Sequence, residues 1–296
     1  MVTDSPARAA RGARPESREA AELRAIRSQH PQLQSAVDLH LELLEVQRRI
    51  QGRVPLPVLE ITPDSIARHQ ASATSILRFE DIPLDLSDLR LIVRQIADVL
   101  RRYGALEETD YQKVQALGRD MRLLAVTGQW FRSGLEQQVA SVGVPMSGSF
   151  AELEGHEVFD QVLTLSMRPF LSRCAEVLQR RPELSSWTHA HCPLCSGQPD
   201  FSVITPSAER HLICARCELR WKWESLTCPY CRNSERAKIT SFATSDGQYR
   251  VYACDVCRRY LKAYDGRRAS RPVMPMVDTV ATLPLDAAAI QRGYSS

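Results

Sequence analysis

Apolar residues recur at every third or fourth position between residues 18 and 181, a spacing typical of amphipathic helices that share one core. We expect helices at 35–52, 87–103, 107–130 and 157–180. Another should begin at Thr62, which can cap it while Pro63 occupies the first helical position. Pro169 lies inside the 157–180 segment and is expected to kink the helix or split it in two. Short connections between such helices predict a bundle.

The pattern changes after Pro182. Short runs with strand character follow at 201–205, 210–213, 239–244 and 248–253. The last two flank Asp246-Gly247, a pair that favours a tight hairpin turn. We therefore expect β-hairpins in the final third of the chain, and a domain boundary between residues 182 and 190.

Paired cysteines separate these strand-like runs and carry the most specific chemical signal in the chain. The four C-x-x-C pairs within 66 residues are Cys192/Cys195, Cys214/Cys217, Cys228/Cys231 and Cys254/Cys257. Two such pairs at the ends of a hairpin can complete a tetrahedral metal site. Redox-active dithiols are the rival interpretation, but the βαβ pattern in which they occur is missing here.

The gaps between the pairs predict how they group. Eighteen residues separate the first pair from the second and twenty-two the third from the fourth, and both gaps suit a hairpin, whereas the ten between second and third suit a linker. We therefore expect one ion to be held by Cys192, Cys195, Cys214 and Cys217, and another by Cys228, Cys231, Cys254 and Cys257. An interleaved cross-brace, joining first with third and second with fourth, is the alternative. Four thiolates suit zinc or a single iron, and zinc is the commoner ion.

The fold class predicted is α+β: a helical bundle followed by two tandem zinc-ribbon-like modules with short β-hairpins. The expected divisions are a disordered tail at 1–17, a helical domain at 18–186, the metal-binding modules at 187–271 and a C-terminal segment at 272–296. The fragment 187–271 is expected to bind metal without the helices.

Other candidate groups have plainer interpretations. Cys174 lies in an expected helix and should be an ordinary buried residue, while His189 and His191 flank the first pair as structural or solvated side chains. Trp221 and Trp223 alternate with basic residues, a pattern that can stack nucleobases, although packing between two small modules is favoured.

Composition and charge narrow the function classes. The chain of 296 residues has a net charge of +3, but residues 209–271 hold fourteen Lys/Arg against seven Asp/Glu, so this segment carries +7 and the rest −4. No apolar run is long enough for a membrane span, no export signal is recognised at the N-terminus, and the paired cysteines indicate a reducing cytoplasm. No catalytic motif appears, so we expect no enzyme.

The cysteine motifs resemble those of the formate dehydrogenase accessory protein FdhE family in order, spacing and intervening residues. The matching segments are Cys192-Pro-Leu-Cys-Ser-Gly-Gln-Pro199, Leu212-Ile-Cys-Ala-Arg-Cys217, Cys228-Pro-Tyr-Cys231, Tyr252-Ala-Cys-Asp-Val-Cys-Arg-Arg-Tyr-Leu-Lys262, Met167-Arg-Pro-Phe170, Val277-Asp-Thr-Val-Ala-Thr-Leu-Pro-Leu-Asp286 and Gly293-Tyr294. The resemblance is clear over 150–296 and general before it.

This resemblance implies a cytoplasmic, non-catalytic assembly factor that binds the catalytic subunit of a formate dehydrogenase during maturation. It also implies rubredoxin-like sites, and it favours iron over zinc for the two ions. One departure from the family is Ser196, which follows the first C-x-x-C pair where members commonly have Gly. The second site also lacks Gly after its two pairs and has Arg232 and Arg258 there. One alternative is a redox-active iron protein. The other is a zinc-ribbon protein that binds nucleic acid through its basic C-terminal half, with binding that weakens steeply as salt rises.

Overall fold

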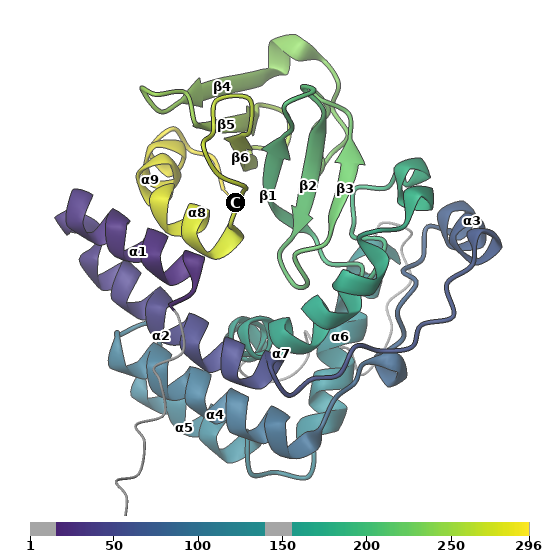
Figure 1. The fold of residues 1–296 in the computed structure, drawn as a ribbon, viewed down its shortest axis with the longest axis vertical. Helices are drawn as coiled ribbons and strands as arrows, with labels where there is room; N and C mark the ends of the chain where they lie inside the picture. Colours follow the sequence, from purple (N-terminus) through teal and green to yellow (C-terminus); the bar gives the residue numbers. More distant parts are fainter. Residues whose placement is uncertain (1–15, 140–155, 296) are drawn as a thin grey trace, which may run out of the picture.

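The computed structural model describes residues 16–139 and 156–295, so most of the tail expected at 1–17 lies outside the described residues. Helices form the first part of the chain, a sheet follows, and two short helices end it (Figure 1). The helices are α1 (Arg18–Gln29), α2 (Gln34–Gln51), α3 (Pro63–Ser72), α4 (Leu86–Arg102), α5 (Glu108–Leu117), α6 (Leu123–Val139), α7 (His156–Leu178), α8 (Pro275–Ala281) and α9 (Leu283–Gln291). Among the described residues, no helix is long and apolar enough to cross a membrane.

Local sequence explains where these helices begin. Thr62 accepts a hydrogen bond from the Ser65 N–H, and the Ser65 hydroxyl accepts one from the Thr62 N–H, which closes a capping box at the start of α3. Asp85 accepts from the first N–H groups of α4. The apolar face of α4 is buried, and the helix packs against α2, α5 and α7, so α4 lies at the centre of the bundle.

One expectation for the helices is corrected. The helix expected at 107–130 is two helices, because the chain turns at Gly118 and the Asp120 carboxylate accepts from the Arg122 N–H near the start of α6. A Cβ at Gly118 would lie 2.9 Å from a side-chain carbon of Arg94, so glycine also allows α5 to approach α4 closely. Of the two outcomes expected at Pro169, a kink or a split, the split does not occur, because α7 continues through this residue.

The carbonyl of Leu165 explains how α7 tolerates this proline. Pro169 has no N–H to offer to that oxygen, four residues earlier in the helix. Gln47 of α2 donates its side-chain amide to the Leu165 oxygen instead, at 2.8 Å. The bundle therefore satisfies the group that the proline leaves without a helical partner.

The sheet has six strands, β1 (Pro199–Ile204), β2 (Arg210–Cys214), β3 (Arg220–Trp223), β4 (Ile239–Ala243), β5 (Tyr249–Cys254) and β6 (Tyr260–Asp265). Their order is β3-β2-β1-β6-β5-β4, in which β1 pairs with β6 in parallel and all other neighbours are antiparallel. The turn between β4 and β5 uses Gly247 at a φ of 69°. The α+β class is confirmed, and the two cysteine modules join into one sheet through β1 and β6.

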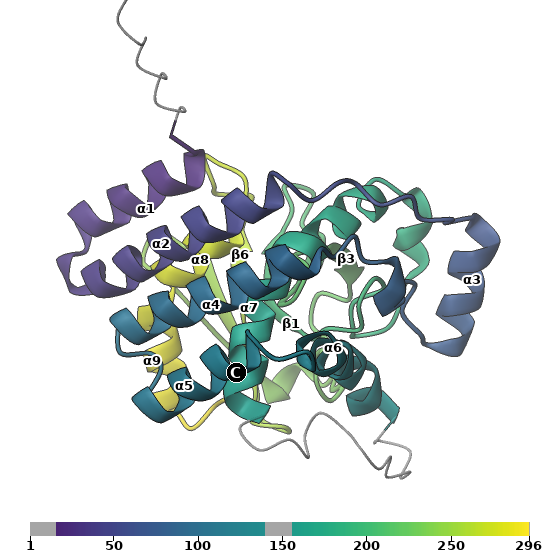
Figure 2. The ribbon, with the colours of Figure 1, turned by 90° about the horizontal axis from the view of Figure 1, so that it is seen from below.

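The last two helices close the sheet onto the bundle. Figure 2 shows α8 beside α1 and α2, which it contacts, while α9 packs on β5. Asp278 of α8 is fully buried and accepts from the Tyr249 hydroxyl at 2.8 Å and from Arg271 at 2.6 Å. This buried network fixes the C-terminal segment against the sheet.

The main hydrophobic core crosses the boundary expected at residue 186. It includes the bundle residues Leu89, Trp130 and Phe170 and continues without a break into Leu194, Leu212 and Trp221 of the first cysteine module. A smaller core joins β5, β6 and α9. The first module therefore shares its core with the helices.

Candidate metal centres

All four C-x-x-C pairs adopt the same turn. In each pair, the N–H of the residue after the second cysteine donates to the carbonyl of the first, at 2.9–3.1 Å. The N–H of the first cysteine donates in turn to the carbonyl five residues later, at 2.9–3.0 Å. These two bonds fold each pair into a tight knuckle that directs both sulfurs to one side.

The residue after each knuckle has left-handed backbone geometry. The φ angles are 58° at Ser196, 61° at Glu218, 59° at Arg232 and 59° at Arg258. Glycine adopts this geometry most readily, and other residues pay roughly 1 kcal/mol or more for it. Glu218 and the three residues noted in the sequence in place of glycine are thus strained at equivalent positions. The hydrogen bonds of the knuckles hold them in this geometry.

The sulfurs of the first site are in mutual contact. Cys192 and Cys217 are 3.5 Å apart, Cys195 and Cys214 3.5 Å, and Cys195 and Cys217 3.6 Å. A tetrahedral site with metal–sulfur bonds near 2.3 Å would space its sulfurs by about 3.8 Å. All four side chains are at most 1% exposed, so this site lies in the interior.

Arg216, inside the second knuckle, fastens the first site to α6. Its guanidinium lies 4.3 Å from the Trp130 ring centre and donates to the Phe131 carbonyl at 3.2 Å, while its backbone N–H donates to the Cys214 sulfur. A Cβ at Gly134 would lie 2.6 Å from this guanidinium, so glycine leaves room for the Arg216 side chain in its present position. The positive charge also offsets the charge of buried thiolates.

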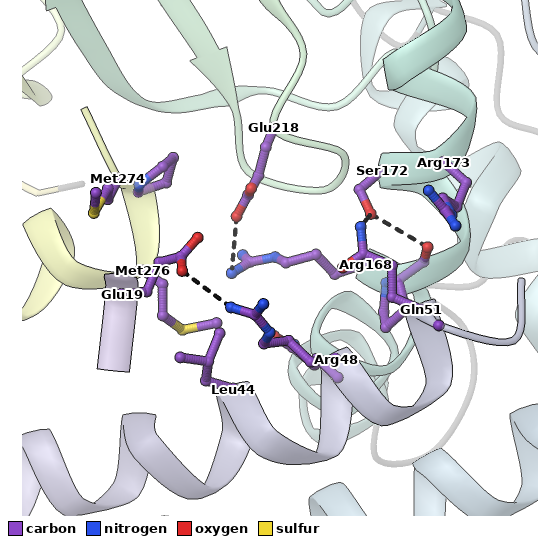
Figure 3. A pocket seen from close by; sticks show the side chains of 14 residues that line it. Glu19, Leu44, Arg48, Gln51, Arg168, Ser172, Arg173, Glu218, Met274 and Met276 are labelled. Atoms are coloured by element: carbon purple, nitrogen blue, oxygen red, sulfur yellow. Dashed lines mark hydrogen bonds and ion pairs between the residues drawn. The ribbon is translucent and has the colours of Figure 1, made fainter. Parts of the chain in front are cut away.

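Arg168 of α7 holds the same knuckle from the other side. It donates to the carbonyl of Ala215 at 2.9 Å, and its guanidinium lies 3.6 Å from the Glu218 carboxylate. Figure 3 shows Arg168 and Arg48 reaching into a pocket of about 460 Å³ between α2, α7 and α8, with Glu218 and Glu19 as their partners. The Met167-Arg-Pro-Phe170 segment therefore joins the bundle to the first site.

The second site has the same internal geometry and different surroundings. Cys228 and Cys257 are 3.7 Å apart, and Cys231 and Cys254 are 3.6 Å apart. Cys231 is exposed, Cys257 is partly exposed, and the neighbouring Val256 is 58% exposed. The strands of this module pack mainly on other β-strands and on α9, whereas the first site packs on helices of the bundle.

The eight cysteines therefore come together in the two sets expected from their spacing, and the cross-brace is not the arrangement seen. All ligand sulfurs within a set lie within 4.8 Å of one another. The described cysteines form no disulfide. Burial raises the pKa of Cys192 and Cys217, so a cluster of thiolates in this interior needs a cation. Four converging sulfurs without a disulfide fit a metal ion of the zinc or iron type.

The other candidate residues lie outside these sets. Cys174 is fully buried in α7, its thiol donates to the Phe170 carbonyl, and burial raises its pKa to about 12. His189 bonds the Gln70 carbonyl oxygen at 2.7 Å and stacks on His191, whose pKa burial lowers to about 4. These are packing roles.

The two tryptophans between the modules also pack inside. Trp221 and Trp223 are 1% and 7% exposed, and their indole N–H groups donate to the carbonyls of His189 and Thr227. Neither ring presents a face on which a nucleobase could stack.

Known proteins resemble the chain in sequence and in fold, although no family model matches it. A protein FdhE homologue of Shewanella oneidensis is 24% identical over 275 residues, which covers 81% of this chain and 89% of that protein. A homologue from Haemophilus influenzae is 26% identical over 54% of the chain. The crystal structure of FdhE from Pseudomonas aeruginosa aligns over 94% of the chain with a TM-score of 0.59 and 19% identity. These relatives confirm the resemblance drawn from the cysteine motifs.

Proposed function

We propose that this chain, which belongs to the FdhE family, is an accessory protein that binds the catalytic subunit of a formate dehydrogenase during its maturation. The support is the relatives named FdhE, together with two four-cysteine sets on the same fold. The observation that carries the proposal is the convergence of eight free cysteines into two contact sets within an FdhE-like fold.

Two metal ions would be held by the eight cysteines, one by each set. The first ion would bind Cys192, Cys195, Cys214 and Cys217, and the second Cys228, Cys231, Cys254 and Cys257. A four-thiolate ion crosslinks the chain and stabilises small modules that have little core of their own. Iron is favoured by the family resemblance, and zinc would serve the structural role equally well.

No catalytic step is proposed. Four thiolates fill the coordination of a tetrahedral ion, so neither site leaves a position for a substrate. The protein would therefore act by binding. Reduced cysteines at contact distance, with no disulfide among those described, support a cytoplasmic location.

A redox role is the second candidate, and the exposure of Cys231 and Cys257 supports it. Electron transfer requires a metal site close to the surface, a condition that the second site meets and the buried first site does not. Iron at the second site with a measurable reduction potential would favour this role, whereas zinc there would leave binding alone.

The partner can be tested by co-purification. The tagged full-length chain, expressed in its host, should retain the formate dehydrogenase catalytic subunit, and loss of the chain should lower formate dehydrogenase activity. The proposal would be contradicted if the tagged chain were recovered without that subunit and cells lacking the chain had normal formate dehydrogenase activity. An Arg53→Ala variant, which removes a surface ion pair to Asp88 and no residue of either cysteine set, is a suitable control.

A further inference from the structure

Arg210 is a buried cation without a carboxylate partner among the described residues. It is the first residue of β2 and is 3% exposed. Its Nη1 donates to the carbonyls of Ser225 and Thr227, both at the long distance of 3.4 Å. Its Nε and Nη2 are buried and have no hydrogen-bond partner in the described structure. A buried guanidinium without a counter-charge is strongly unfavourable, so its position requires an explanation.

The Arg210 side chain extends to the second cysteine site. Arg210 lines a small cavity of about 10 Å³ together with Cys228 and Cys254, and its guanidinium lies 4.9 Å from the Tyr252 ring centre. Since β2 belongs to the first hairpin, Arg210 extends from one cysteine module into the other. The cavity has room for about one water molecule, so no larger ligand can bring the missing charge.

The groups around Arg210 identify the source of that charge. The electrostatic partners that favour its charged form are Tyr252, Tyr230 and Cys228. The ordinary pKa of a phenol is about 10, so the two phenols are neutral near pH 7 and supply no negative charge. Cys228 is different, because a cysteine that binds a metal ion does so as a thiolate.

We propose that Arg210 is the counter-charge of the second cysteine site, where four thiolates around a divalent ion leave a net charge of about −2. The inference rests on the proposed metal binding at this site. Arg210 would act as a positioning residue: it binds no metal itself, and its positive charge stabilises the negatively charged group of four thiolates and metal ion. At the first site, a comparable position is taken by Arg216, which lies inside the second knuckle and whose backbone N–H donates to the Cys214 sulfur.

A larger pocket beside Arg210 gives the competing interpretation. This pocket of about 580 Å³ is also lined by Lys222, Trp223 and Arg232, and an anion could enter it. An anion there would not reach Nε or Nη2, because both atoms are closed to solvent. The internal thiolates are therefore the better match for the unpaired groups.

A counter-charge predicts effects of opposite sign in two backgrounds. With metal bound, replacement of Arg210 by Met removes an attraction and should destabilise the site. Without metal at the second site, the same replacement removes an uncompensated buried charge and should leave the chain equally stable or more stable. A residue that only fills space would destabilise both forms.

The test uses the full-length chain loaded with zinc, carrying Arg210→Met, Arg210→Lys or Arg232→Met. Zinc affinity is measured by competition with a chromophoric chelator, and a Cys254→Ser chain identifies which release phase belongs to the second site. Arg210→Met should lower the zinc affinity of the second site by about 10- to 100-fold, as expected for a residue that supports metal ligands. The zinc affinity of the first site should not change. Arg210→Lys keeps the charge and should recover much of the affinity. Arg232→Met, at an exposed residue beside Cys231, should change it little.

Thermal unfolding of Arg210→Met in the loaded and Cys254→Ser backgrounds completes the cycle. The inference predicts a lower Tm in the loaded chain and an equal or higher Tm in the Cys254→Ser chain. Unchanged zinc affinity, or equal losses of Tm in both backgrounds, would overturn the counter-charge and leave the metal site standing. A wild-type chain that binds no zinc or iron in the second site would overturn both proposals. If Arg210→Met does not fold, Arg210→Gln, which also removes the charge, replaces it in both measurements with the same expected results.

Discussion

The two cysteine sites share one knuckle geometry and differ in what surrounds them. The first is enclosed by the bundle, with Arg216 bonded to α6 and Arg168 to the Ala215 carbonyl. The second lies where β5 ends and β6 begins, with Cys231 exposed. The same local motif can therefore serve as part of a core in one place and as a surface module in another. The stability of the whole chain should depend on the first site. The second site should exchange its metal ion with the solvent more readily.

Serine substitution of one cysteine in each site should give the largest contrast. Cys214→Ser should remove one ion and destabilise the helices too, because this residue belongs to the main core. Cys254→Ser should remove the other ion and leave the bundle folded. Metal analysis and hydrogen exchange of both variants would measure this, and equal loss of protection in α4 would contradict the contrast.

Removal of the helical bundle should have the next largest effect, because the two sites should differ in whether they keep their metal ion. The fragment 187–271 lacks the α6 and α7 groups that hold Arg216 and the Ala215 carbonyl. We therefore expect the fragment, for which the sequence alone predicts metal binding without the helices, to keep at most one ion, at the second site. Metal content of the purified fragment decides this, and two tightly held ions would show that the helices are dispensable.

Removal of the Arg216 side chain should have an intermediate effect. Arg216→Met breaks the bonds to Phe131 and Ser133 and the contact with Trp130, for a loss of about 2–4 kcal/mol in the free energy of unfolding. Arg232→Met, at the surface of the second site, should cost roughly 0.5 kcal/mol or less. Urea unfolding compares the two, and similar losses would argue against the difference in burial.

The smallest effect concerns the left-handed residue after the third knuckle. At Arg232, with a φ of 59°, glycine should be more stable than alanine by about 1 kcal/mol. Both variants remove the same side-chain atoms beyond Cβ, so the pair isolates the backbone preference. Thermal unfolding of Arg232→Gly and Arg232→Ala measures it, and a more stable alanine variant would contradict the strain.

The local features were accessible from sequence because their causes are local. Two residues between cysteines, the Thr62-Pro63 start and the Asp246-Gly247 turn each act over a few positions. The break at Gly118 was missed because α5 and α6 keep an apolar pattern on both sides of it, and the close approach to Arg94 is a long-range contact.

The unequal burial of the two sites could not be deduced from their spacing. It depends on side chains far apart in sequence, such as Arg216 against Trp130 and Arg168 against Ala215. The joining of the modules through β1 and β6 is likewise non-local. Arg168 within the family-like Met167-Arg-Pro-Phe170 segment was the available signal, since a charged residue in an apolar helix needs a partner.

Metal release from the full-length protein tests the central claim most directly. Protein purified without oxygen should contain two ions per chain, and a chelator in excess should remove them in two phases. The faster phase should disappear in Cys254→Ser, and the slower phase should coincide with loss of helical structure. No bound metal, or a single phase in which both ions leave as the helices unfold, would contradict the account of one enclosed and one exposed site.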